Sequence, residues 1–273
     1  MSASLANAAP NAAAVLRQDS GAVALLTLNR PASRNALSRA MLSALREALA
    51  AIAGDDSIRC VVIAAEGPVF SSGHDLKEMT ARRADADGGA AFFTATLDDC
   101  AAMMQQVVYL PQPVIGAVEG IATAAGCQLA ASCDLLVASE AARFCTPGVN
   151  LGLFCTTPAV ATARAMPRKA AMEMLLLGEM VPAAEAQRMG LVNRVVPKGQ
   201  ALAAAMEMAG RIAARSGAAL RLGKRGVNAQ IGLPLDRAYD IASDVMVQNL
   251  MTEDAVEGID AFLGKRHPEW RHR

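Results

Sequence analysis

Short apolar segments that suit β-strands recur along the chain, and stretches with helical spacing separate them. Ile58 to Ala64 is a continuous run rich in β-branched residues, Pro113 to Val118 starts at a proline that blocks a helix, and Asp134 to Ala138 is a third such segment. A strand that is apolar on both faces is typical of a parallel sheet covered by helices. The alternation therefore predicts an α/β fold with a core of parallel sheets.

Helical spacing is clearest after Ser38 and in the last third of the chain. Ser38 can cap a helix that runs to Gly54, whose apolar positions are Met41, Leu42, Leu45, Leu49 and Ile52. We also expect a strand over 22–28, an edge strand at Phe144, a helix over 92–110, and an almost wholly helical region after Pro158, with segments at 172–177, 183–189, 201–214 and 235–250. The chain then divides into a flexible leader (1–16), an α/β core (17–200) and a C-terminal helical region (201–273).

Composition and charge argue against several classes of protein. The 273 residues are 53% hydrophobic, which suits one main domain with a large core. Basic and acidic residues number 26 each, so no excess charge favours nucleic acid or an anionic membrane as a partner. The six cysteines include no Cys-x-x-Cys pair, and no histidine lies at the spacing of a metal-binding motif from them. This pattern favours reduced thiols and no metal site. No basic residue precedes Arg17, so we expect no targeting peptide and a cytoplasmic protein.

Two turns made of small residues are suited to bind a carbonyl oxygen through the main chain. One is Thr123-Ala124-Ala125-Gly126, which runs into Cys127-Gln128, and the other is Ser71-Ser72-Gly73-His74-Asp75. The first N–H groups of a helix have no partner within it, so each turn can offer one to a ligand. Two such donors aimed at one oxygen would form an oxyanion hole. Taken singly, each turn is equally compatible with an ordinary strand-to-helix connection.

These turns and four other fragments resemble, in wording and order, the crotonase superfamily, also called the enoyl-CoA hydratase/isomerase family. The fragments are Leu28-Asn29-Arg30-Pro31, Arg34-Asn35-Ala36-Leu37-Ser38, Phe70 to Glu78, Pro113 to Gly120, Gly126 to Asp134 and Ala261 to Arg266. Each is a weak signal alone, whereas their order over most of the chain is a strong one. The resemblance implies a spiral of ββα units and C-terminal helices that form trimers and hexamers.

The resemblance also implies roles for individual residues. The N–H groups of His74 and Ala125 would bind the thioester carbonyl of an acyl-CoA and stabilise the enolate formed from it. Hydratases of the superfamily carry glutamates at the positions of Gln128 and Gly148, so the chain resembles an enoyl-CoA hydratase domain-containing branch that lacks both. Neither an amide nor a glycine can act as general acid or base. Gly148 would also leave room for a bulkier acyl group.

The other candidate site residues surround these positions. Contacts with the acyl part of the substrate are expected from Ser72, Asp75, Leu76, Ala124, Asn150, Cys155 and Thr156. The adenosine and phosphate end of coenzyme A is expected to bind Arg30, Arg34, Phe262 and Lys265, and the last two would reach a neighbouring subunit. Solvated charges are the alternative for the basic residues. Cys155 is either a nucleophile or a small buried thiol, and His74 is the side chain best suited to exchange protons.

Residues 80–90 are polar and end in Gly88-Gly89, which predicts a mobile surface loop. In the superfamily such a segment covers the acyl pocket, so this loop either orders on ligand binding or is a solvated connection without a role.

The resemblance therefore implies an acyl-CoA-binding protein that needs no cofactor beyond the CoA of its ligand. It would be an enoyl-CoA hydratase with weak turnover, or an enzyme for another enolate-type reaction of a CoA thioester, such as a lyase, isomerase or hydrolase. The alternative is a non-catalytic acyl-CoA binding or scaffold protein that has kept the oxyanion hole. A structural subunit without a ligand is the third reading.

Overall fold

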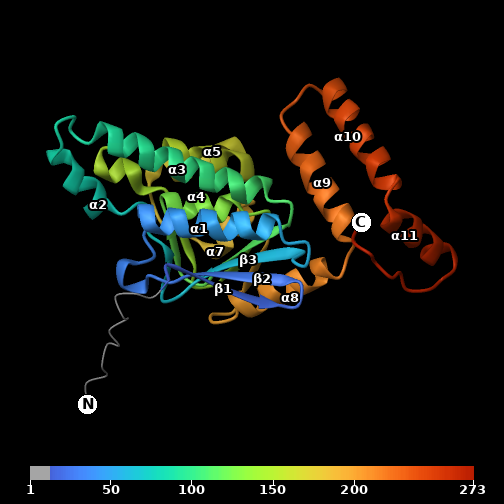
Figure 1. Cartoon of the computed structure of the whole chain (residues 1–273). Helices are drawn as coiled ribbons and strands as arrows, with labels where there is room; N and C mark the ends of the chain where they lie inside the picture. Colours follow the sequence, from blue (N-terminus) through green and yellow to red (C-terminus); the bar gives the residue numbers. More distant parts are fainter. Residues whose placement is uncertain (1–12) are drawn as a thin grey trace, which may run out of the picture.

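The computed structural model describes residues 13–273, and the strands in this range form two sheets (Figure 1). The larger sheet has the order β1 (Val15–Ser20), β2 (Val23–Leu28), β3 (Cys60–Ala65), β5 (Val114–Val118), β7 (Leu135–Ser139), β10 (Arg194–Val196). The smaller sheet has the order β4 (Val69–Ser71), β6 (Ile121–Thr123), β8 (Arg143–Cys145), β9 (Val181–Pro182). Neighbours are parallel except β1 with β2 and β8 with β9. The predicted core of parallel sheets is confirmed.

Repeated strand-strand-helix units build the two sheets together. Each unit places its first strand in the larger sheet and its second in the smaller one: β3 with β4, β5 with β6, and β7 with β8. The helices that follow are α2 (Leu76–Ala81), α4 (Ala125–Ser132) and, after the 3-10 turn η3 (Pro147–Leu151), α5 (Thr156–Ala165). The chain thus winds as the expected spiral, and β4, β6 and β8 lie side by side.

Helices cover both faces of the larger sheet because its central strands are apolar on both sides. On β3, Val61 and Ile63 pack in a cluster with α1 (Arg39–Ala53) and α3 (Ala90–Tyr109), whereas Cys60 and Val62 pack with α8 (Ala201–Ala213). Figure 1 shows α1 above this sheet and α8 below it. The five apolar residues expected on the core face of α1 are all buried, and Ser38 caps the helix.

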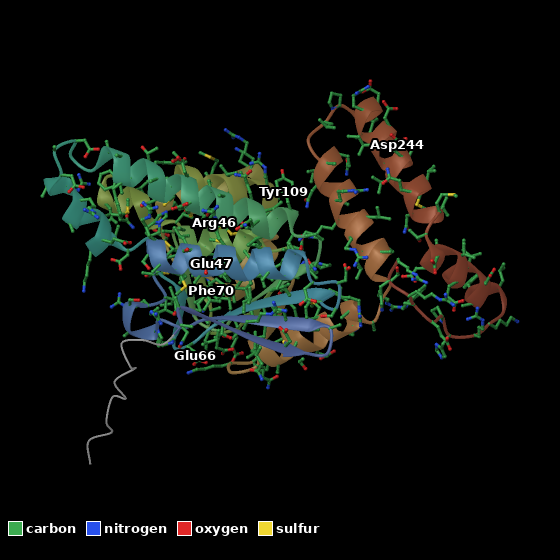
Figure 2. The ribbon with its side chains drawn as sticks, in the orientation of Figure 1. Arg46, Glu47, Glu66, Phe70, Tyr109 and Asp244 are labelled. Atoms are coloured by element: carbon green, nitrogen blue, oxygen red, sulfur yellow. The ribbon has the colours of Figure 1, made fainter. Side chains whose placement is uncertain are left out.

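Three C-terminal helices stand apart from the sheets (Figure 1). Lys224, on the first of them, fastens them to the core. Its ammonium group donates to Asp134 Oδ2 at 2.6 Å and to the carbonyls of Val107 and Gln112 at 3.2 and 3.1 Å. Figure 2 shows Tyr109 at the end of α3 that faces this helix. The three helices are α9 (Gly217–Gln230), α10 (Leu235–Leu250) and α11 (Glu253–Leu263).

Most of the expected elements are present, with differences at the two ends of the chain. The strand at 22–28 and the helix at 92–110 are confirmed. A strand is also present at Phe144, but the expectation of an edge strand is wrong, because β8 pairs with β6 on one side and with β9 on the other. β1 starts at Val15, inside the range expected to be a flexible leader, and residues 1–12 of that leader lie outside the described residues. After Pro158 the expected helices are interrupted by β9 and β10, and α9 was not anticipated. The remaining helices there are α6 (Arg168–Leu177) and α7 (Ala183–Arg188).

The expected loop at 80–90 is shorter than predicted and is pinned to α3. Helix α2 reaches Ala81, and a 3-10 turn, η2, spans Arg82–Ala84. The guanidinium of Arg82 lies 5.2 Å from the centre of the Phe92 ring, and that of Arg83 lies 5.7 Å from the Phe93 ring. Cation–π contacts of this kind hold the segment against the helix that follows it.

The last ten residues fold back along α11. Arg266 makes two hydrogen bonds to Glu257, at 2.6 and 2.8 Å, and Glu257 also accepts the N–H of Glu269 at 2.7 Å. A methyl group built on Gly258 would lie 3.0 Å from the ring of Trp270, the only tryptophan of the chain. Within residues 13–273, no helix has both the length and the apolar character that crossing a membrane requires.

We expect acid to release this C-terminal tail. The hydrogen bonds from Arg266 and from the Glu269 N–H lower the pKa of Glu257 from 4.5 to about 2. A carboxyl group whose pKa falls on folding stabilises the native state above its unfolded pKa, and this contribution is lost as the pH falls toward the folded value. The fluorescence emission of Trp270 should therefore shift to longer wavelength between pH 4.5 and pH 2.

Variants on α11 separate local release from global unfolding. Glu257→Gln should show the shifted emission already at neutral pH, with an unchanged far-UV circular dichroism spectrum. Asp260→Asn removes an exposed carboxylate from the same helix and should behave as the parent. An emission that stays unchanged in Glu257→Gln would refute the assignment of the tail to this ion pair.

Candidate functional site

Three turns meet at one edge of the smaller sheet. Because β4, β6 and β8 are parallel neighbours, their carboxyl ends lie together, which is where α/β proteins commonly bind ligands. The turn after β4 carries Gly73 and His74, the turn after β6 carries Ala124 and Ala125, and the turn after β8 carries Gly148. The sheet topology thus brings the predicted oxyanion turns and the following loop to one place.

The first two turns touch through their main chains. Gly73 has a φ of 88°, and a methyl group built on it would lie 2.8 Å from Cβ of Ala124 and 3.1 Å from the nitrogen of Ala125. A methyl group on Gly126 would collide with the carbonyl oxygen of Ser71. Only glycine leaves room for so close an approach. The N-terminus of α4 therefore lies directly against the turn that carries His74.

Two amide hydrogens are unpaired at this junction. Ala125 is the first residue of α4, and within residues 13–273 neither its N–H nor that of His74 is hydrogen-bonded. Ala124, just before the helix, has φ 51° and ψ −122°, a strained conformation for a residue with a side chain. Two unpaired donors on adjacent turns can hold one oxygen atom of a ligand.

Asn35, to which the sequence assigned no role, braces the first turn. Its side chain is fully buried, accepts the N–H of Arg30 at 2.8 Å, and donates to the carbonyls of Glu66 and Val69 at 2.9 and 2.8 Å. These bonds tie the segment before α1 to Glu66, which precedes β4, and to Val69, the first residue of β4. Its place within the Arg34-Asn35-Ala36-Leu37-Ser38 fragment was the only sequence signal for this role.

Arg30 and Arg34, expected to bind coenzyme A, support the same turn through their backbones. The N–H of Ser72 donates to the Arg34 carbonyl at 3.0 Å, and the N–H of Leu37 donates to the Gly73 carbonyl at 2.7 Å. The Arg30 guanidinium donates to the carbonyls of Ala13 and Asn29. The Arg34 side chain is exposed.

Gln128 lies one helical turn after Ala125. It is 5% exposed, and its side-chain oxygen Oε1 is buried without a hydrogen-bond partner among residues 13–273. The amide is therefore a buried polar group at the start of α4, and it has no charge to gain or lose near neutral pH.

Cys155 fills the space that Gly148 was expected to leave open. A methyl group built on Gly148 would lie 2.8 Å from the sulfur of Cys155 and 3.1 Å from its nitrogen, and the Gly148 N–H donates to that sulfur at 3.3 Å. The expectation of extra room beside the ligand at this position is therefore wrong. The missing side chain makes room for another residue of the protein.

The thiol of Cys155 is protonated near neutral pH. Burial raises its pKa, and the hydrogen bond from the Gly148 N–H opposes this shift only in part. Burial also raises the pKa of two other thiols around this turn, to about 12 for Cys127 and about 11 for Cys145. These environments favour a small packing residue over a nucleophile at Cys155. All six cysteines are free thiols.

The imidazole of His74 is neutral near pH 7. Burial lowers its pKa, and the nearby Leu37 carbonyl and Glu78 carboxylate oppose the shift only in part. Neither ring nitrogen has a hydrogen-bond partner within residues 13–273. A neutral ring with an unpaired nitrogen can accept a proton from a ligand.

The remaining residues expected in these loops differ in role, since two make structural hydrogen bonds and the others differ in exposure. Asp75 caps α2, because its carboxylate accepts the N–H groups of the second and third residues after it at 3.0 and 3.2 Å. Asn150 donates its amide to the Gly178 carbonyl at 3.1 Å, which ties η3 to the end of α6. Ser72 is half-buried, whereas Leu76 and Thr156 are exposed.

Phe262 and Lys265 are not brought to the three turns within one chain. Phe262, on α11, is 82% exposed, and Lys265 follows the end of that helix. Figure 1 shows α11 on the opposite side of the molecule from α2, the helix that follows His74. A contribution of these residues to a site requires a second subunit.

Gly148→Ala should destabilise the protein, because the added methyl group meets both the sulfur and the nitrogen of Cys155. We expect the free energy of unfolding in urea to fall by about 2 kcal/mol, a usual cost of overpacking. Gly210→Ala, on α8, faces open space and should be neutral or stabilising.

The double variant Gly148→Ala/Cys155→Ala tests the cause of this loss. Removing the sulfur should recover part of the lost stability, because the contact with the main-chain nitrogen of position 155 remains. A double variant as unstable as Gly148→Ala would show that the sulfur does not set the size limit.

Sequence comparison identifies the known proteins that this chain resembles. The sequence profile of the family described as enoyl-CoA hydratase/isomerase matches residues 18–273. Enoyl-CoA hydratase domain-containing protein 3, mitochondrial, from Rattus norvegicus is 47% identical over 256 residues, which cover 94% of this chain and 83% of that protein. The 2,3-dehydroadipyl-CoA hydratase of Escherichia coli (strain K12) is 37% identical, and the match covers 92% of this chain and 96% of that protein.

Solved structures agree with the sequence comparison. The crystal structure of human enoyl coenzyme A hydratase domain-containing protein 3 superposes with a TM-score of 0.89 at 44% identity and covers 94% of this chain and 100% of its own. The crystal structure of an enoyl-CoA hydratase of Mycobacterium smegmatis superposes with a TM-score of 0.89 at 47% identity, and the match covers 94% of this chain and 98% of that one. With its spiral of ββα units and its C-terminal helices, this chain belongs to the enoyl-CoA hydratase/isomerase family and has the crotonase fold.

Proposed function

We propose that this protein binds an acyl-CoA thioester and holds its carbonyl oxygen with the amide hydrogens of His74 and Ala125. The contact between the two turns supports this most directly, since Gly73 lies against Ala124 and Ala125 and leaves two unpaired donors side by side. Donors that the fold fixes in advance stabilise a developing negative charge without reorganising. An enolate formed next to the thioester carbonyl would place its charge on this oxygen.

The proposed reaction is an enoyl-CoA hydratase-like conversion with low turnover, or another enolate-type reaction of a CoA thioester. The carboxylate of Asp75 in the first turn is engaged in capping α2. Gln128 and Cys155 are poor acids and bases, because Gln128 does not titrate and burial raises the pKa of Cys155. Each positioned acid or base contributes about 10²- to 10⁴-fold to the rate, so a site without paired carboxylates is slow. His74 is the group there best suited to exchange a proton.

The second candidate is a non-catalytic acyl-CoA binding or scaffold protein. The tight fit of Cys155 against Gly148 supports it, because this packing leaves no place for a carboxylate at that turn. Such a protein would hold the thioester and leave it unchanged.

We also propose that the chain assembles as a homotrimer or a hexamer. Large apolar side chains are exposed on the outlying helices and at the end of α10, including Tyr239, Met251 and Phe262 at 65%, 80% and 82%. Covering them with a second copy would remove apolar surface from water and bring Phe262 and Lys265 to a neighbour. The cytoplasmic location stays a prediction, and several relatives are named as mitochondrial.

Two ligands that differ only in the carbonyl group test the oxyanion hole. Butyryl-CoA should bind at least about tenfold more tightly than the thioether S-butyl-CoA, because only the thioester offers an oxygen to the two donors. Isothermal titration calorimetry gives both dissociation constants, with free CoA as the reference. Equal constants would refute the hole, and a lack of binding by every CoA ligand would refute acyl-CoA binding altogether.

Turnover of 2-butenoyl-CoA separates an enzyme from a binding protein. We expect a slow loss of the absorbance of the conjugated thioester, reduced a further 10²-fold or so in His74→Ala, with butyryl-CoA affinity unchanged within about twofold. Lys77→Ala, an exposed neighbour on α2, is the matched control. Stable absorbance despite tight thioester binding would favour the scaffold function, and an undiminished rate in His74→Ala would exclude His74 from proton transfer.

A further inference from the structure

A cavity of about 600 Å³ lies where the C-terminal helices meet the core. One wall is formed by residues 109–111 at the end of α3, and the other by one side of α9 between Ala218 and Ala229. Figure 2 shows Tyr109 at the end of α3 that faces α9. No residue of the three turns lines this cavity, and its volume is in the range usual for small-molecule sites.

The walls of this cavity are mainly apolar and extend along α9. The helix contributes Ala218, Leu222 and Ala229, and the end of α3 contributes Leu110 and Pro111. At 1.5 Å per residue, the helix rises about 16 Å between Ala218 and Ala229. The cavity is therefore an elongated apolar groove, a shape that suits an extended hydrocarbon chain.

Positive charge without a matching acid flanks the same groove. Lys224, Arg221 and Arg225 line it, whereas no aspartate or glutamate does, and Lys224 is neutralised by its ion pair with the core. Arg221 donates to the His272 carbonyl at 2.7 Å, and Arg225 donates to Gln248 Oε1 at 2.6 Å. Within residues 13–273, neither guanidinium forms an ion pair with a carboxylate. Each has further N–H donors, so both can bind an anion.

We infer that this groove binds a long-chain carboxylate, with the hydrocarbon chain between α9 and residues 109–111 and the carboxylate at Arg221 and Arg225. The two arginines are one helical turn apart, so their side chains are neighbours on the helix surface. Guanidinium groups bind carboxylates through paired charge-assisted hydrogen bonds, and their aliphatic stems extend the apolar wall. A neutral chain would leave this charge unused, and a cationic chain would be repelled.

Two ligands of equal chain length test the role of charge on the parent protein. Isothermal titration calorimetry, below the micelle and solubility limits, should show decanoate binding at least about tenfold more tightly than decan-1-ol. Hexanoate should bind more weakly than decanoate, because each buried methylene group contributes about fourfold in affinity. Saturating butyryl-CoA should leave the decanoate affinity unchanged within about twofold, because the groove and the three turns are separate sites.

Variants locate the site. Arg221→Met/Arg225→Met removes both charges but keeps unbranched side chains, and should lower the affinity for decanoate to that for decan-1-ol while the alcohol binds as before. Arg211→Met removes an exposed arginine of α8 outside the groove and should behave as the parent. Ala229→Phe adds a ring at an exposed position of the groove and should weaken the binding of both ligands.

Several outcomes would overturn the inference. Equal affinities of decanoate and decan-1-ol for the parent, displacement of decanoate by butyryl-CoA, or a preference for decanoate that survives in Arg221→Met/Arg225→Met would each do so. Failure of decanoate to bind would also overturn it, whether sedimentation then shows a second copy covering the groove or the protein binds phosphatidylglycerol vesicles instead.

The ligand pair on the parent and the Ala229→Phe variant decide the question even if the double arginine variant does not fold. A failure of butyryl-CoA to bind would refute only the proposed function, so the two failures are distinguishable.

Discussion

The close contact between the main chain at Ser71 and the first turn of α4 is the constraint on which the site depends. Gly126 admits this contact because any side chain there would meet the Ser71 carbonyl, and Gly73 does the same on the facing turn. The contact is possible only because β4 and β6 are parallel neighbours in a small sheet. Sheet topology, glycine placement and the close approach of two turns are therefore parts of one arrangement, with the strain at Ala124 as its local cost.

Uncharged groups dominate the surroundings of these amides. Asn35 holds the first turn with three hydrogen bonds to the main chain, and Cys155 packs against Gly148 as a protonated thiol. A buried amide at Gln128 and a neutral imidazole at His74 complete the set. The carboxylate at the first turn, that of Asp75, is engaged in capping α2.

Local pattern was enough to predict elements whose residues bury an apolar face, such as α1 and β3, because burial imposes the spacing that the sequence displays. It was also enough to locate two turns of small residues that lie against each other, since glycine and alanine in sequence order mark close approach. It did not predict α9, whose attachment depends on Lys224 reaching carbonyls more than a hundred residues away. Nor did it predict that Cys155 occupies the volume beside Gly148, a consequence of how η3 returns into α5.

The pairing of Gly148 with Cys155 restricts how this protein can change over evolution. Any side chain at position 148 meets the sulfur and the main-chain nitrogen of Cys155, so a larger residue there is better tolerated in descendants in which position 155 has already become smaller. The two sites are thus epistatic, and the order of substitutions matters. A lineage that keeps the cysteine is therefore under pressure to keep a glycine at position 148, however its other loops diverge.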